Sequence, residues 1–220
     1  MNKNIFQFRH ITKYYKTKLG VNSSERALNN ISFTIKEKQS VAFIIDNDNL
    51  RTIFADVVSG LDSPDSGKIL INDEEAFFDG YPYTQLGLML KEPSFINTYD
   101  GFNNLKMLSE YNESYENDRI SKTMSFVGLD PLSETKVCNY SSAMFKKLCL
   151  AYALIPNNEL LILNEPFKYL NEYALKEFFK IYSNLKNKKT MIYISESHPF
   201  LTQLCDTIYI VENGQILRLK

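Results

Sequence analysis

The spacing of hydrophobic and polar positions predicts strands and helices that alternate along most of the chain. In NISFTIKEK, residues 30–38, apolar side chains occupy every second position, as in a strand with one buried face. VAFII (41–45) and LLIL (160–163) are continuously apolar, which is typical of strands covered on both faces. Strands of that kind usually belong to a parallel sheet, so the pattern predicts an α/β core.

Helical spacing of apolar residues follows the first of these buried strands. It extends from 53 to 61, where Gly60 provides a C-terminal stop. The change from strand to helix therefore falls in DNDNLR, residues 46–51. Residues 99–128 carry two helical patterns with no strand between them, which predicts an inserted helical lobe. Further helices are predicted at 144–155 and 175–185, and further strands in TMIYIS (190–195) and TIYIVENGQILRLK (207–220).

These elements predict one domain over residues 1–220, because a chain of 220 residues suits a single core with a lobe. We expect the core at 1–91 and 151–220 and the helical subdomain at about 92–150. The sheet of the core should be mixed and largely parallel. The N-terminal third and the hairpin SGKILIND, residues 66–73, should add an antiparallel flank.

Charge and cysteine content narrow the classes of partner and compartment. Lys and Arg number 25 against 26 Asp and Glu, a balance that argues against a large nucleic-acid interface. Three cysteines without metal-like spacing suit a reducing cytosol and core packing better than a disulfide framework. MNKNIFQFRHITK lacks the pattern of a signal peptide, and no apolar run approaches the ~20 residues of a membrane helix. Any membrane link should therefore run through another subunit.

The order of the motifs resembles the nucleotide-binding domain of ATP-binding cassette (ABC) transporters over almost the whole chain. The resemblance rests on several segments at the expected separations: RHITKYYKTK, ALNNISFTIKEKQSVAFII, VVSGLDSPDSGKILIND, LGLMLKEPSFINTYDGFNNLKML, YSSAMFKKLCLAYALI, LLILNEP and ISESHPFLTQLCDTIYIVENGQIL. It implies a P-loop NTPase-like ABC ATPase core with an inserted helical subdomain. It also implies ATP and Mg²⁺ as cofactors, and a cytoplasmic protein held at the inner face of the cell membrane by a membrane subunit.

The phosphate-binding loop is the segment that departs most from the family pattern. The resemblance places Asn47 in this loop, Arg51 at the usual lysine and Thr52 at the usual magnesium-binding hydroxyl. The family pattern GxxxxGK[ST] uses glycines to point backbone amides inward, but no glycine stands between Val41 and Ser59. Side chains occupy the glycine positions instead, at Ile45, Asp48 and Leu50.

The acidic residues of the loop add repulsion to this steric block. Asp46 and Asp48 would face the phosphates, and each like-charge contact near ~4 Å costs about 1 kcal/mol in water and about 4 kcal/mol at a surface-like dielectric. A planar guanidinium at 51 also does not reproduce the compact reach of a lysine. We therefore predict that this chain binds the triphosphate poorly or not at all.

Other family positions are partly retained. The resemblance places Asn164 where an aspartate holds magnesium through water, and Lys91 where a glutamine contacts metal and water at the joint with the helical lobe. Glu165 matches the carboxylate that polarises the attacking water, and His198 matches the histidine that contacts the γ-phosphate. As alternatives, Asn164 would have only a structural role, and Glu165 and His198 would only cap or cross-link loops.

Two more sites follow from the resemblance. Tyr15, or Tyr14 as the alternative, would stack on adenine, although a solvent-edge tyrosine near a strand has the same sequence pattern. YSSAM corresponds to the signature LSGGQ, with Ser141 kept and Ser142 and Ala143 in place of its two glycines. In this family the signature of one subunit completes the site of another. The segment 141–143 would therefore act in trans.

Three functions remain open from the sequence. The first is a degenerate nucleotide-binding subunit that pairs with a more complete ATPase subunit. A heterodimer is favoured because a homodimer would contain two impaired sites. In this function the helical lobe and the Lys91 joint would receive a coupling helix of an integral membrane subunit. The second is an active ATPase with a divergent loop, and the third is a soluble regulatory or scaffold protein that uses the fold away from any membrane.

Overall fold

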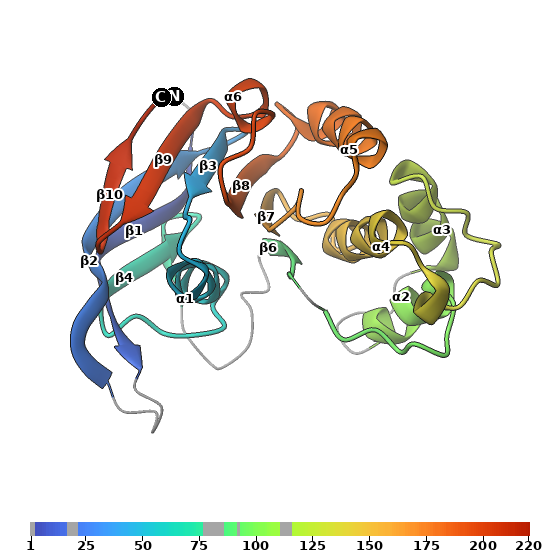
Figure 1. The fold of residues 1–220 in the computed structure, drawn as a ribbon, viewed down its shortest axis with the longest axis horizontal. Helices are drawn as coiled ribbons and strands as arrows, with labels where there is room; N and C mark the ends of the chain where they lie inside the picture. Colours follow the sequence, from blue (N-terminus) through green and yellow to red (C-terminus); the bar gives the residue numbers. More distant parts are fainter. Residues whose placement is uncertain (1–2, 17–21, 77–85, 92, 111–115) are drawn as a thin grey trace.

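Two sheets form the core of the protein. The computed structural model describes residues 3–16, 22–76, 86–91, 93–110 and 116–220. The smaller sheet is antiparallel and has the order β2-β1-β4-β5. Its strands are β1 (Asn4–Lys16), β2 (Asn22–Lys36), β4 (Ser66–Ile71) and β5 (Glu74–Glu75). This sheet is the antiparallel flank predicted from the N-terminal third and the 66–73 hairpin (Figure 1).

The larger sheet has the order β10-β9-β3-β8-β7-β6. Its strands are β3 (Ser40–Ile44), β6 (Leu86–Met89), β7 (Leu160–Asn164), β8 (Thr190–Ser195), β9 (Thr207–Glu212) and β10 (Gln215–Arg218). All neighbours are parallel except β9 and β10, which form an antiparallel edge. The predicted α/β fold with a mixed, largely parallel sheet is confirmed.

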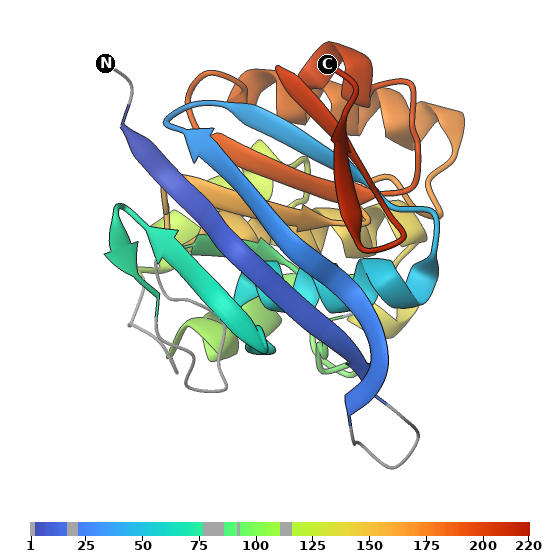
Figure 2. The ribbon, with the colours of Figure 1, turned by 90° about the vertical axis from the view of Figure 1, so that its left-hand side faces the viewer.

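Helices cover both faces of the larger sheet. They are α1 (Asp48–Ser59), α2 (Gly101–Glu110), α3 (Asn117–Phe126), α4 (Ser142–Leu154), α5 (Glu172–Leu185) and α6 (Leu201–Leu204), with a 3₁₀ turn at Val137–Asn139. Helix α1 lies between the two sheets, where the antiparallel sheet covers it in Figure 2. Helices α2 to α5 occupy the opposite side of the molecule in Figure 1.

The alternation of side chains along each strand explains why the central strands are apolar throughout. Val41 and Phe43 pack in the core cluster that contains α1, whereas Ala42 packs in the cluster with α4 and α5. In β8, Ile192 and Tyr193 divide between the same two clusters. A strand with a core on each face needs apolar residues at every position.

Helix α1 begins and ends where the sequence predicts. Its N-cap is Asn47, whose side chain accepts a hydrogen bond from the amide of Leu50, within the predicted range 46–51. Its C-cap is Gly60, which has a left-handed conformation with φ of 82°. The strand-to-helix transition is therefore held by local capping at both ends of α1.

The helical lobe is built from α2, α3 and α4. Helix α4 continues to Leu154 and also packs on β6, so the expected boundary near residue 150 falls inside one helix. The division into a core and a subdomain stays a prediction. In the described part of the chain, no helix has the length and apolarity needed to cross a membrane.

Candidate functional site

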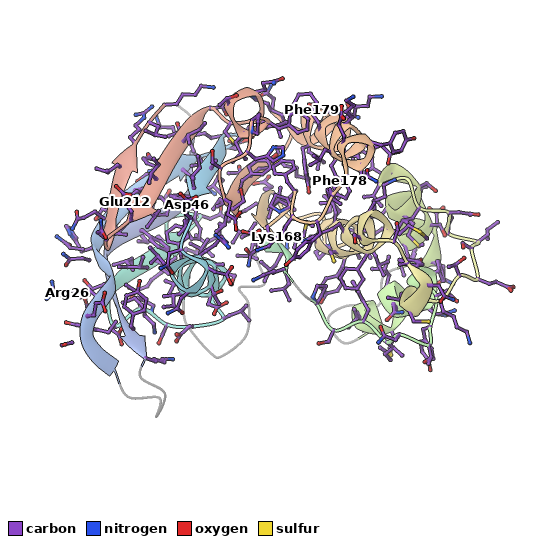
Figure 3. All side chains as sticks on the ribbon, in the orientation of Figure 1. Arg26, Asp46, Lys168, Phe178, Phe179 and Glu212 are labelled. Atoms are coloured by element: carbon purple, nitrogen blue, oxygen red, sulfur yellow. The ribbon has the colours of Figure 1, made fainter. Side chains whose placement is uncertain are left out.

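The candidate site lies at the carboxyl ends of three neighbouring parallel strands. Strand register aligns Ile44 at the end of β3 with Ser195 at the end of β8, and Asn164 of β7 with Ile194. Helix α1 starts immediately beyond β3. In open α/β sheets, ligands bind at this edge. Asp46 and Lys168, which follow β3 and β7, are both labelled in Figure 3.

Three backbone amides at the junction of β3 and α1, those of Ile45, Leu50 and Arg51, already have partners within the chain. The amide of Ile45 donates to Ser195 O at 3.0 Å, and the amide of Arg51 donates to Asn47 O at 2.9 Å. The amide of Leu50 donates to the Asn47 side chain at 2.8 Å. Asn47, predicted in the nucleotide loop, therefore serves as a helix cap in this structure. The cap takes up an amide that an anion at the helix N-terminus would need.

Arg51 turns inward and is only 2% exposed. Its guanidinium donates to the carbonyl oxygens of Ile45 and, at 3.4 Å, Asp46. It also forms ion pairs with three carboxylates: Asp48, Glu165 and Glu196. All three guanidinium nitrogens are engaged, and every one of these partners is an acceptor.

Two lysines complete the group of charges around Arg51. Lys168 Nζ lies 3.7 Å from both Glu165 Oε2 and Glu196 Oε1 and 3.9 Å from Asp48 Oδ1. Lys91 Nζ lies 3.4 Å from Asp48 Oδ1. The ion pair with Lys91, followed by the charge of Arg51, lowers the pKa of Asp48. We call the residues Asp48, Arg51, Lys91, Glu165, Lys168 and Glu196 the charge cluster; it contains three cations and three carboxylates.

Glu165 is fixed from two directions. It is 2% exposed and has a left-handed backbone with φ of 53°, an uncommon conformation for a residue with a side chain. Its amide donates to Ile194 O at 2.8 Å, and its carbonyl oxygen accepts from Lys146 Nζ of helix α4 at 2.8 Å. The side chain thereby meets Arg51 while the backbone is tied to β8 and α4.

The two residues predicted near magnesium are neutral and lie at different depths. Thr52 is exposed, and its hydroxyl donates to Asp48 O at 2.9 Å, which leaves the oxygen lone pairs free to accept. Asn164 Oδ1 is buried and has no hydrogen-bond partner among the residues that the structure describes. Both residues stand beside the charge cluster in sequence, but neither contributes a charge to it.

His198 lies in an aromatic stack. Its ring is parallel to Phe167, with centroids 4.6 Å apart, and contacts Phe200 at 5.1 Å. His198 Nδ1 accepts from the backbone amide of Phe200 at 3.3 Å. Burial lowers the pKa of His198, because desolvation disfavours the imidazolium. The ring therefore has its proton on Nε2 in the neutral form.

We expect the pKa of His198 to be lower in the folded chain than in the unfolded chain, where it should be about 6.5. The neutral ring then contributes stability above the unfolded pKa, and this contribution is lost as pH falls through the folded pKa. Titration of the His198 Cε1–H resonance by NMR measures it, with His198→Phe assigning the signal. A folded midpoint above that of a short unfolded peptide would contradict the packing argument.

The remaining predicted residues lie at the ends of other elements. Ser141 is the N-cap of α4 and accepts from the amide of Met144 at 3.2 Å; Ser142 is exposed and Ala143 is half-buried. Tyr15 is half-buried against the core of the antiparallel sheet, where burial, followed by the charge of Glu25, raises its pKa. Their roles toward nucleotide stay predictions.

The structure therefore joins Arg51, Glu165 and Lys91 of the predicted set, and adds residues that sequence reasoning missed. Lys168 and Glu196 are the missed partners. Lys168 had a usable signal, since it follows Glu165 by three residues in a tight turn. Glu196 had none, because the pairing of β8 with β3, which aligns Ser195 with Ile44, brings it to Arg51.

Sequence comparison relates the chain to one large family. The family model for ABC transporters matches residues 28–168. The zinc import ATP-binding protein ZnuC of Rickettsia conorii is 27% identical over 217 residues, which cover 98% of this chain and 86% of that protein. YybJ of Bacillus subtilis, an uncharacterized ABC transporter ATP-binding protein, is 27% identical over 190 residues, which cover 86% of this chain and 87% of that protein.

Solved structures match the fold over nearly the whole chain. A bacterial ABC transporter cassette solved as a dimer has a TM-score of 0.82 at 16% identity, covering 98% of this chain and 99% of that one. The structure of cbiO1 from Clostridium perfringens, part of the ABC transporter complex cbiONQ, has a TM-score of 0.80 at 18% identity. That match covers 98% of this chain and 87% of cbiO1.

Proposed function

Because the chain belongs to the ABC transporter family as an ATP-binding cassette subunit, we propose that it is a degenerate member, which binds nucleotide weakly and pairs with a more complete cassette subunit. A second part of the proposal is that the pair is held at the cytoplasmic face of a membrane by an integral membrane subunit. Hydrolysis would then depend on the partner cassette.

The observation that carries the proposal is the reversed polarity of the loop after β3. A loop that binds phosphate presents N–H donors to oxygen anions. Around Arg51 this loop presents oxygen acceptors to a cation: the carbonyls of Ile45 and Asp46 and the carboxylate of Asp48. Phosphate oxygens in the same place would meet like charge, which supports weak binding of a nucleotide.

The residues at the predicted magnesium position also fit the metal poorly. Mg²⁺ in nucleotide sites is held by one or two carboxylates together with phosphate oxygens. Thr52 and Asn164 are neutral, and the carboxylate of Glu165 is paired with Arg51 and Lys168. A divalent ion here would have to displace existing cations, so this chain's residues favour a site that stays without metal.

Residues 141–143 could complete the site of a partner cassette even though the loop after β3 is proposed to bind nucleotide weakly. Ser141 and Ser142 are exposed at the start of α4 and lie outside the charge cluster. They remain accessible to a partner cassette even if the loop after β3 binds no nucleotide. We therefore keep the heterodimer as the proposed assembly, in which Ser141, Ser142 and Ala143 complete the partner's site.

Phosphate release tests the enzymatic half of the proposal. The purified chain alone is expected to hydrolyse Mg-ATP no faster than a protein-free control, because its loop neither holds the phosphates nor retains a free base at Glu165. Hydrolysis by the pure chain that disappears in Glu165→Gln, assayed at a temperature where the variant is folded, would support an active ATPase with a divergent loop instead.

Recovery of partners tests the assembly. Affinity purification of the chain from its own cells in a mild detergent is expected to bring down an integral membrane protein and a second cassette subunit with an intact glycine-rich loop. Recovery of the chain as a monomer or homodimer without any membrane protein would favour the soluble scaffold function and contradict the proposal.

A further inference from the structure

We propose that Arg51 is a built-in ligand of this site: its guanidinium occupies the junction of α1, β7 and β8 and holds these elements together without nucleotide. The inference deepens the proposed function, since it explains how a cassette that binds ATP weakly keeps its site ordered. Arg51 would thus supply, from the chain itself, the cation that links these three elements.

The contacts of Arg51 reach three elements that are distant in sequence. Through Asp48 and the Ile45 carbonyl, the guanidinium closes the start of its own helix α1. Through Glu165 it reaches the end of β7, and through Glu196 at 3.2 Å it reaches the end of β8. One side chain therefore connects residues separated by as many as 145 positions.

Helix α4 is joined to the same point. Lys146, 5% exposed, donates to the backbone carbonyl of Glu165 at 2.8 Å, while the Glu165 side chain pairs with Arg51. The path Lys146–Glu165–Arg51 thus runs from the helical lobe to α1. Because both ends are buried, the position of α4 relative to the loop is set by the chain's own groups.

Local packing alone does not account for this arrangement. An exposed pair at i,i+3 on a helix contributes little and needs no burial of the guanidinium. Here the guanidinium is 3% exposed and meets a carboxylate that is also 3% exposed, a costly arrangement unless each donor has a partner. The fork geometry of arginine lets the guanidinium donate to four oxygens, those of Ile45, Asp46, Asp48 and Glu196, and also pair with the Glu165 carboxylate, whereas a lysine ammonium has three donors.

The shape of the site makes the inference testable by chemical rescue. Arg51→Ala removes the atoms of one ethylguanidinium ion and leaves an opening lined by the Ile45 and Asp46 carbonyls and by Glu165. We expect the variant to unfold about 6–20 °C below the wild type, because a buried carboxylate loses its principal partner. Ethylguanidinium at about ten times its dissociation constant should then raise the Tm of the variant by about 3–6 °C.

Controls separate this result from a general effect of the ion. Arg218 is exposed, so Arg218→Ala should unfold at the temperature of the wild type. Ethylguanidinium should raise neither the Tm of Arg218→Ala nor that of the wild type. Arg51→Lys keeps the charge but not the fork and should also unfold several degrees early. If Arg51→Ala does not fold, a wild-type Tm for Arg51→Lys overturns the inference, and a lowered one supports it.

If Arg51→Ala folds, the inference is overturned when its Tm equals that of the wild type, or when ethylguanidinium does not raise its Tm. Either result would leave the proposed function intact, since weak nucleotide binding is measured separately on the wild-type chain. Conversely, tight binding of ATP by the wild type would contradict the proposed function, even with a clear ethylguanidinium effect on the variant.

Discussion

Replacing Glu165 with Gln is expected to lower the free energy of unfolding by about 3 kcal/mol. The substitution keeps the shape of the side chain but removes, of the three carboxylates paired with the buried Arg51 guanidinium, the one that is itself buried. Breaking a buried ion pair from one side costs about 3–5 kcal/mol, and we take the lower end because Asp48 and Glu196 stay paired with the guanidinium. Urea unfolding followed by circular dichroism measures the difference.

The matched control is Glu196→Gln, which removes another carboxylate of the same arginine. Glu196 Oε1 lies 3.2 Å from Arg51 Nη2, but its side chain is 57% exposed. Solvent screening should limit the loss of stability to less than about 1 kcal/mol. Equal losses for the two variants, or no loss for Glu165→Gln, would mean that Glu165 is not the structural partner of Arg51.

Phe167→Ala should destabilise the fold by about 3–5 kcal/mol. Phe167 is 6% exposed, and its ring contacts Tyr182 of α5, Tyr193 of β8 and the ring of His198. Its removal leaves a cavity between helix and sheet, and losses of this size are usual for a buried aromatic residue. The same denaturant measurement applies, and the pKa of His198 should return toward its usual value as the ring gains solvent.

Tyr173→Ala serves as the control for an aromatic residue in the same region. Tyr173 is 74% exposed at the start of α5, so its loss should change stability by less than about 0.5 kcal/mol. A Phe167→Ala variant as stable as Tyr173→Ala would contradict the predicted contribution of the buried Phe167 ring to stability.

The architecture could be predicted because its signals are local and repeated. Continuous apolar runs at 41–45 and 160–163 become β3 and β7, and the capping residues Asn47 and Gly60 set the limits of α1. The ranges of β1, β5 and β6 were not predicted, and β5 has only two residues. β1 has irregular pairing with several bulges, which blurs its alternation, and β6 has only four residues. Both depend on neighbours that are remote in sequence.

The chemistry of the site could be predicted only in part, since the sequence shows which side chains are charged but not the direction in which each one points. The absence of glycine in the loop and the arginine at position 51 are visible in the sequence. The inward turn of Arg51 onto Glu165 is not, because it depends on the ends of β7 and β8 lying beside α1. Asp48, which sequence reasoning places against a phosphate, instead pairs with Arg51 and Lys91.

The charge cluster also changes the interpretation of Glu165, which the resemblance matches to a catalytic carboxylate. In the resemblance it is a candidate base, whereas in the structure its carboxylate is the counter-ion of a buried guanidinium. A base that must leave such a partner before it accepts a proton is poorly placed for catalysis. Under the proposed function, the ion pair with Arg51 gives Glu165 a structural role that requires no hydrolysis by this chain.

Equilibrium titration of the wild-type chain with a fluorescent ATP analogue, with and without Mg²⁺, tests the central claim most directly. A triphosphate needs N–H donors, but the loop after β3 presents carbonyl acceptors, and the donors of Arg51 are already directed at these carbonyls and at Glu165. We predict no saturation below about millimolar analogue, corresponding to a binding free energy weaker than about −4.1 kcal/mol, and no effect of Mg²⁺. Saturable, Mg²⁺-dependent binding in the micromolar range would contradict the account.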